Sequence, residues 1–220
     1  MRNFVYLSDA RVDAFHSQIP KESLQQLTGD AGAPNRFGHA LAVELHLASQ
    51  GLLGGLDDRA TFIRGALPFS YGVVEDYSQE LAFFGAKVEG GWVFLVGPRA
   101  GMVAGVDAVT TGGRLDSASA LTHRGLKSLN QLLRSEEAGD LQKGLEAFDP
   151  QLVLKLRDGM SLFPAATMPL HYLARTLHRV RTKEEFFALA TPVFVSAVPE
   201  MEKKQSAGGL GGLFGKLFGR

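Results

Sequence analysis

Cysteine is absent from the 220 residues of the chain. Without thiols the protein forms no disulfide scaffold, no zinc–thiolate site and no iron–sulfur cluster, and no cysteine can act as a nucleophile. Long hydrophobic runs are missing too. No stretch approaches the ~20 consecutive apolar residues of a transmembrane helix, and the N-terminal residues show no apolar run followed by a small-residue cleavage site. We therefore expect a cytoplasmic protein without a spanning segment.

The chain also lacks a charge of one sign. Its 23 Lys and Arg residues balance 23 Asp and Glu residues, so no overall field draws the protein to nucleic acid or to an anionic membrane. Any electrostatic attraction must come from a local patch. With 45% hydrophobic residues, 21% charged residues and a mean hydropathy of +0.01, the composition is that of a globular protein.

The apolar pattern predicts an α+β fold, with a central, mostly antiparallel sheet and helices packed on it. Short β-branched and aromatic runs predict strands, and the glycines of the sequence EGG at 89–91 predict a hairpin between two of them. The predicted strands are 4–8, 61–69, 80–88, 92–98, 102–109 and 192–198. Spacings of three and four predict helices at 9–19, 37–53, 119–137, 149–160 and 169–190. Residues 21–36 are expected to form a polar connection.

We expect three parts along the chain. Residues 1–199 are predicted to form a single α+β domain with a helical insertion at about 117–183. A charged hinge follows at 200–207. Residues 208–220, with the sequence GGLGGLFGKLFGR, form a tail whose composition differs from that of the rest.

A polar constellation follows the first predicted strand. Asp9, Asp13 and His16 fall at positions i, i+4 and i+7 and therefore on one side of a helix. Two carboxylates and an imidazole can hold a divalent cation or share acid–base chemistry. Alternatively, Ser8 and Asp9 cap the helix, Asp13 complements its dipole and His16 is solvated. Because two carboxylates oppose an anion, the functional alternative favours a cation or a basic partner.

Basic residues gather in the last predicted helix, among them His171, Arg175, His178 and Arg179. Such a helix can meet phosphate or nucleic acid, but no aromatic platform or recognised nucleic-acid motif accompanies it, and nucleic acid is not the expected partner. Arg64 and Arg99 are further candidates for contact with an anionic ligand.

Several stretches resemble an uncharacterised bacterial family known only as a domain of unknown function. They are the opening FVYLSDARVDAF, the central FIRGALPFSYG and LAFFGAKV, and the closing LATPVFVSAV. The likeness covers residues 3 to about 198, with Arg11 standing where the family pattern has Lys. The family implies no activity. It does imply that Ser8, Asp9, Val12 and Asp13 belong to a shared pattern.

The tail has a helical pattern of its own. Its apolar side chains occupy relative positions 0, 3, 4, 7 and 8, within one face of about 140°, and two cations flank that face. These residues are Leu210, Leu213, Phe214, Leu217 and Phe218, with Lys216 and Arg220. Burying the five side chains at ~1.5–3 kcal/mol each roughly offsets the entropy of ordering about ten residues, so binding would be weak and reversible. Three alternatives stay open for the tail: a helix docked on its own domain or in a partner's groove, an interfacial helix on a membrane surface, or a flexible end.

No local signature of a hydrolase, a zinc protease or a kinase is present. We therefore expect a non-enzymatic binding or adaptor protein, localised by the tail to a partner or to the inner face of the membrane, with homo-oligomerisation as a further option. The alternative is a metal-assisted hydrolase using Asp9, Asp13 and His16, for which a divalent cation would be the cofactor; no other cofactor is expected. A weaker alternative is a nucleic-acid-associated protein using the basic helix.

Overall fold

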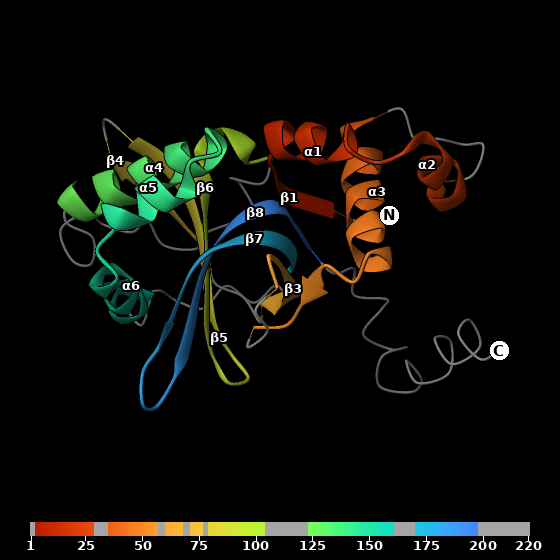
Figure 1. Ribbon diagram of the computed structural model, residues 1–220. Helices are drawn as coiled ribbons and strands as arrows, with labels where there is room; N and C mark the ends of the chain where they lie inside the picture. The colour runs from red at the N-terminus through yellow and green to blue at the C-terminus, as the bar shows by residue number, and fades with distance from the viewer. Residues whose placement is uncertain are drawn as a thin grey trace.

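The computed structural model describes residues 3–28, 35–56, 60–67, 71–76, 79–103, 123–160 and 170–197. Helices and strands are both present in this part of the chain, which confirms the predicted α+β class (Figure 1). The helices are α1 (Asp9–His16), α2 (Lys21–Thr28), α3 (Arg36–Ser49), α4 (His123–Glu137), α5 (Leu141–Glu146) and α6 (Gln151–Met160), with a short 3-10 helix η1 (Arg99–Gly101). The strands are β1 (Asn3–Leu7), β2 (Leu53–Gly54), β3 (Phe62–Leu67), β4 (Tyr71–Asp76), β5 (Gln79–Val88), β6 (Gly91–Pro98), β7 (Leu170–Arg181) and β8 (Phe186–Ala197).

The strands form one mixed sheet in the order β2-β3-β7-β8-β6-β5-β4, and β1 also pairs with β8. Its pairs are antiparallel except for β2 with β3 and β6 with β8, so the prediction of a mostly antiparallel sheet is confirmed. The predicted hairpin joins β5 to β6, and Gly90 takes the positive φ of 84° that this turn needs.

Strand β8 lies at the centre of the sheet and changes its partner halfway along. Residues 186–190 pair with β6, whereas residues 194–197 pair with β1 along the same edge. Pro192 lies between these two pairings. Proline has no backbone N–H, and at this position neither β6 nor β1 pairs with β8, so no hydrogen bond to them is lost. The TPVFV stretch therefore contains the point at which the strand beside β8 changes from β6 to β1.

Two groups of helices pack against the sheet, and Figure 1 shows them on either side of the crossing β7 and β8. Helices α4–α6 bury leucines and Phe148 against Phe94 and Phe187 of the strands. Helices α1 and α3 bury Val12 and Val43 against Phe194. A third cluster consists of strand residues and includes Ile63 and Phe84. The junction between the two groups of helices is the place where the candidate site forms.

The predicted helix at 169–190 is wrong, because residues 170–181 form β7 and residues 186–190 are the first part of β8. Strand β7 lies between β3 and β8, and half of its residues are buried, including the consecutive Tyr172, Leu173 and Ala174, so its sequence does not alternate cleanly. Its register with β8 also shifts between Leu173 and Ala174 and between Thr176 and His178. These irregularities space its apolar residues by three and four, which imitates the period of a helix.

Other differences are smaller. The last described helix, α6, ends at Met160, and residues 170–181 form strand β7. The helical insertion predicted at about 117–183 therefore does not extend to residue 183. Residues 21–28 form α2 where a connection was expected. Of the predicted strand at 102–109, Met102 makes an isolated bridge to Tyr6, while residues 104–109 lie outside the described part. The hinge at 200–207 and the tail at 208–220 also lie outside it. None of the described helices is long and apolar enough to cross a membrane.

Candidate functional site

The opening turn places its carboxylates at the surface. Asp9 is the first residue of α1, and its Oδ2 accepts a hydrogen bond from Arg36 Nη1 of α3 at 3.2 Å. Asp13 is exposed. Ser8 occupies the N-cap position, but its side chain makes no capping hydrogen bond and instead accepts one from Arg11 Nη1 at 3.1 Å.

His16 lies at the end of α1 and stacks on His39 of α3, with ring centroids 3.9 Å apart and planes at 19°. Burial, followed by the neighbouring His39, lowers the pKa of His16, and Asp13 partly opposes this shift. Over the described ranges no group of three or more His, Asp or Glu side chains is arranged to hold a metal ion. The structure therefore pairs Asp9 and His16 with residues of α3 and does not gather the three predicted ligands into a metal centre.

The two predicted anion contacts lie apart from each other. Arg64 is an exposed residue of β3, and its Nη1 lies 3.9 Å from Oε1 of Glu44 on α3. Arg99 is half-buried at the start of η1. Neither lines the pocket that the other basic residues form.

Three of the four basic residues predicted together do share a pocket, although they lie on a strand. Arg175, His178 and Arg179 of β7 line a pocket of about 330 Å³. The pocket opens where β3 stops pairing with β7, beyond the Phe62–Arg175 pair. Its other walls come from the residues preceding β3, from the start of α5 and from β7 itself: Thr61, Leu141, Thr176 and Leu177. The fourth basic residue, His171, is exposed further back along β7 and is not among the lining residues.

Arg179 is held in place by the chain that precedes β3. Its Nη2 donates to the backbone oxygen of Ala60 at 2.6 Å and to Thr176 Oγ1 at 3.1 Å. These contacts fix one end of the guanidinium group at the edge of the pocket. The cation is therefore oriented before any ligand arrives.

Arg175 is held by a carboxylate from the opposite side. Its Nη1 donates to Glu136 Oε1 of α4 at 2.9 Å, and Glu136 Oε2 accepts from Arg11 Nη2 of α1 at 2.6 Å. Glu137 lies 3.5 Å from the same Arg11 nitrogen. The Glu136 and Arg11 side chains are only 3% and 6% exposed, whereas Arg175 is 32% exposed.

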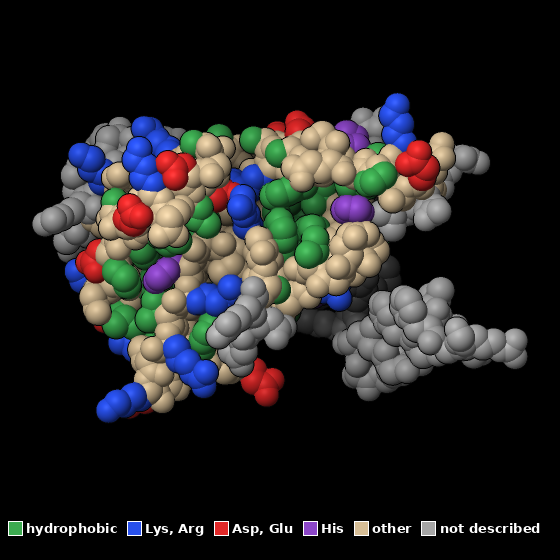
Figure 2. Space-filling view, in the orientation of Figure 1, with side chains coloured by type: hydrophobic (Ala, Val, Ile, Leu, Met, Phe, Trp, Pro, Cys, Tyr) green, Lys and Arg blue, Asp and Glu red, His purple; other side chains and the backbone are tan. Residues whose placement is uncertain are grey.

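This ion-pair network connects the two groups of helices above β7. In Figure 2, Lys and Arg side chains gather in the middle of the molecule, between the two groups. We name Arg11, Glu136, Glu137 and Arg175 the seam network. Sequence reasoning missed it, because Arg11 and Glu136 lie 125 residues apart in the chain. The one local signal of the seam network in the sequence was Arg11, the cation in the opening stretch FVYLSDARVDAF.

His178 adds a less polar side to the pocket. Its ring meets Phe148 edge to face at 5.6 Å. Burial lowers the pKa of His178 below its usual value of 6.5, so the ring is mostly neutral at pH 7. The positive charge of the pocket therefore comes from the two arginines.

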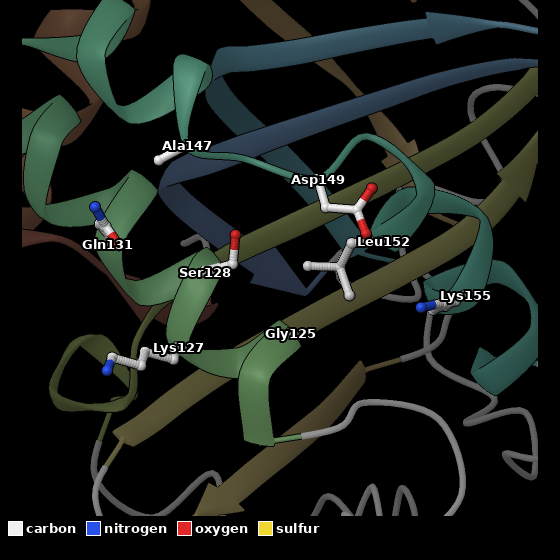
Figure 3. Close-up of a pocket in the computed structure, with 8 residues that line it drawn as sticks. All are labelled: Gly125, Lys127, Ser128, Gln131, Ala147, Asp149, Leu152 and Lys155. Atoms are coloured by element: carbon white, nitrogen blue, oxygen red, sulfur yellow. The ribbon is translucent and has the colours of Figure 1, made fainter.

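A larger pocket of about 600 Å³ lies between α4 and α6. Figure 3 shows Asp149 and Leu152 on one side of it and the ammonium group of Lys127 pointing away from Asp149. Lys127 and Lys155 are both exposed, and Asp149 Oδ1 accepts from the backbone N–H of Gln151. Its charges are mixed, and neither lysine makes a side-chain hydrogen bond or ion pair with another described residue, so this pocket is a weaker candidate than the one on β7.

Comparison with known proteins adds a family but no activity. Neither the curated proteins nor the solved structures contain a match to the chain. A family model matches residues 30–199, which include α4 and β7 with Glu136, Arg175 and Arg179 but not α1 with Arg11. The match spans more than half of the chain, and the protein therefore belongs to the family described as Family of unknown function (DUF7019).

Proposed function

We propose that this protein is a non-enzymatic binding protein that takes a small anion into the pocket on β7. The observation that carries the proposal is the fixing of two guanidinium groups around one pocket. Arg175 is bonded to the buried Glu136, and Arg179 is bonded to Ala60 and Thr176. Guanidinium groups bind carboxylate and phosphate oxygens through paired N–H donors.

Preorganisation supports binding by these residues. A flexible arginine loses rotamer entropy when it binds a ligand, but an arginine already held by hydrogen bonds loses less. The pocket volume of about 330 Å³ lies at the lower end of the range for small-molecule sites. Both features favour a small ligand over a macromolecule, so the nucleic-acid hypothesis receives less support.

The metal-assisted hydrolase remains the alternative function. It requires Asp9, Asp13 and His16 to face one ion. The geometry favours it less, since Asp9 is bonded to Arg36 and His16 is stacked on His39. A rise in melting temperature with Mg²⁺ or Mn²⁺ that Asp13→Ala removes would favour the hydrolase.

The adaptor part of the proposal concerns the tail at 208–220 and rests on its sequence pattern. We expect the tail to localise the protein to a protein partner or to a membrane surface. Full-length protein and a variant ending at Ala207 should therefore differ in recovery with anionic vesicles or in cell-extract pull-downs. Equal recovery of both in every assay would contradict a role for the tail.

The anion site is tested by isothermal titration of the full chain with acetate, butyrate, succinate and inorganic phosphate. At least one anion should bind, and Arg179→Gln should weaken that binding at least about tenfold, in line with the loss of one charge-assisted hydrogen bond. Arg64→Gln is the matched control. It removes the same charge from the neighbouring strand β3, outside the pocket, and should leave binding unchanged. Absence of binding by all four anions, or equal effects of the two variants, would overturn the proposal.

A further inference from the structure

We infer that the tail at 208–220, which lies outside the described residues, docks on an apolar surface of α3 in the same chain. This surface consists of Phe37, Leu41, Leu45 and Leu52, and we name it the α3 stripe. The inference rests on the adaptor part of the proposed function and adds its regulation. A tail held on α3 is withheld from a partner or a membrane surface.

The α3 stripe is the outer side of its helix. Phe37, Leu41 and Leu45 are spaced four residues apart and therefore share one side of α3. Phe37 and Leu41 are half-buried, whereas Leu45 is 47% exposed. The inner side is buried in the core and consists of Ala40, Val43 and Leu47. Helix α3 is therefore apolar on a side that the described fold leaves partly open.

Leu52 extends the stripe past the end of the helix. Gly51 takes a positive φ of 65°, and the backbone N–H of Leu52 donates to the Leu47 carbonyl at 3.0 Å. This turn keeps Leu52 beside the last turn of α3. Within the described part of the chain, the exposed large apolar side chains are Leu45 and Leu52, at 47% and 46%. Because both lie at the same end of one helix, they indicate a docking surface more than scattered surface residues.

The tail has an apolar face of the same length as the stripe. From Leu210 to Phe218 its pattern advances by eight residues, and from Phe37 to Leu45 the stripe also advances by eight. At 1.5 Å per residue, each face is about 12 Å long. Two helices with such faces can pack side by side and remove both faces from water.

The described chain stops close to the beginning of the stripe. Ser196 of β8 pairs with Phe4 of β1, and the rings of Phe4 and Phe37 stack with centroids 5.1 Å apart. Figure 1 shows the start of β1 beside α3. Twelve residues, 198–209, separate β8 from Leu210. Since an extended chain covers about 3.3 Å per residue, this length reaches every part of the stripe.

Covalent attachment favours the chain's own tail over the tail of a second copy. A short tether holds a segment at an effective concentration in the millimolar range, about a hundredfold above the tails that other copies offer at about 10 µM protein. The weak contact expected from five apolar side chains is therefore populated within one chain before it is populated between two chains.

The test uses the absence of cysteine from the chain. Gly215→Cys introduces one thiol on the glycine side of the tail, and a nitroxide spin label is attached to it in the full chain. We expect the methyl signals of Leu41 and Leu45 to lose most of their intensity in ¹H–¹³C NMR spectra. The signals of Leu141, on α5 in the other group of helices, should keep theirs. Adding Leu217→Ser should weaken the contact at least about tenfold and restore the α3 signals.

Two results would overturn the inference. The first is full intensity of the Leu41 and Leu45 signals in the spin-labelled chain, or a loss that Leu217→Ser does not change. The second comes from a mixture of isotope-labelled chain without nitroxide and spin-labelled chain without isotopes. A loss of the Leu41 and Leu45 signals in this mixture as large as that within one chain would place a second copy on the stripe.

Vesicle binding tests whether docking competes with the proposed localisation. Leu45→Ser should raise the recovery of the full chain with anionic vesicles by up to about tenfold, because it frees the tail. Lys127→Ser, at an exposed position of α4, is the control and should leave recovery unchanged. Equal recovery of wild type and Leu45→Ser would overturn the competition. If neither is recovered while the α3 signals are lost, the docked tail stands and the membrane part of the proposed function fails.

Discussion

Glu136 links three elements of the fold through its carboxylate. Its two oxygens accept from Arg11 of α1 and Arg175 of β7, and it belongs to α4. A carboxylate this deeply buried is stable only when its charge and lone pairs are matched. The same match orients Arg175 toward the pocket, so one residue serves both the fold and the candidate site.

Glu136→Gln should destabilise the protein by about 3–5 kcal/mol, because it leaves the buried guanidinium of Arg11 without its main counter-charge. The free energy of unfolding in urea measures this effect. Glu137→Gln is the control on the next residue of the same helix. Its longer and more exposed contact predicts a loss of about 1 kcal/mol or less. Equal losses in the two variants would contradict a special role for Glu136.

Tyr6 and Gly97 provide a second test at single residues. The Tyr6 hydroxyl is buried and has no hydrogen-bond partner among the described residues, and burial raises the pKa of this phenol. A methyl group on Gly97 would collide with the Tyr6 hydroxyl and its Cζ. We expect Gly97→Ala to destabilise the protein by about 1–3 kcal/mol and Tyr6→Phe to be near neutral or stabilising.

Combining Tyr6→Phe with Gly97→Ala should recover part of the stability that Gly97→Ala removes, because the hydroxyl is one of the atoms in the collision. Thermal or urea unfolding of the two single variants and the double variant forms the cycle. Strict additivity of the two effects would show that the hydroxyl and the added methyl group do not meet.

Among the elements, β7 shows most clearly what sequence can and cannot predict. The strands β1, β3, β5 and β6, the second half of β8 and the helices α1, α3, α4 and α6 follow from local spacing, whereas residues 186–190 of β8 were predicted as helix. The spacing fails in β7, where register shifts against β8 move its apolar residues out of alternation. Sequence still grouped Arg175, His178 and Arg179 correctly as basic neighbours. Their partners Ala60 and Glu136 come from distant elements and were not predictable from one sequence.

The packing of α1 on α3 should depend on pH through His16. Burial and His39 lower its pKa in the folded protein, so below about pH 6.5 the unfolded chain binds more protons than the folded one. The stability that neutral His16 contributes is fully present above the pKa of His16 in the unfolded chain. It is lost as pH falls toward the lower pKa of His16 in the folded protein. Asp13 and the Asp9–Arg36 pair also belong to this side of α1 and α3, and Asp13 opposes the shift.

The measurement is the free energy of unfolding between pH 5 and pH 8 for the wild-type protein and for His16→Gln. The variant should lose less stability than the wild type as pH falls through 6.5, because it has no imidazole to protonate at this site. A steeper loss in the variant would contradict the sign of the shift. His171→Gln, on an exposed part of β7, is the control and should follow the wild-type curve.

For the whole molecule, the sequence correctly indicated an α+β protein and its family. It did not show that two groups of helices lie over one sheet and are joined by buried charges. This arrangement depends on β8, which pairs with β6 in one half and with β1 in the other. Such long-range pairing leaves no mark in local periodicity.

The most direct test of the anion site is a titration of the arginine side-chain N–H signals by ¹H–¹⁵N NMR, first with butyrate and then with inorganic phosphate. We predict that the Nε–H signals of Arg175 and Arg179 shift together and saturate at the same ligand concentration. The signal of Arg64, outside the pocket, should stay in place. Equal shifts of Arg64, or no shift of Arg175 and Arg179 with either anion, would contradict an anion site on β7.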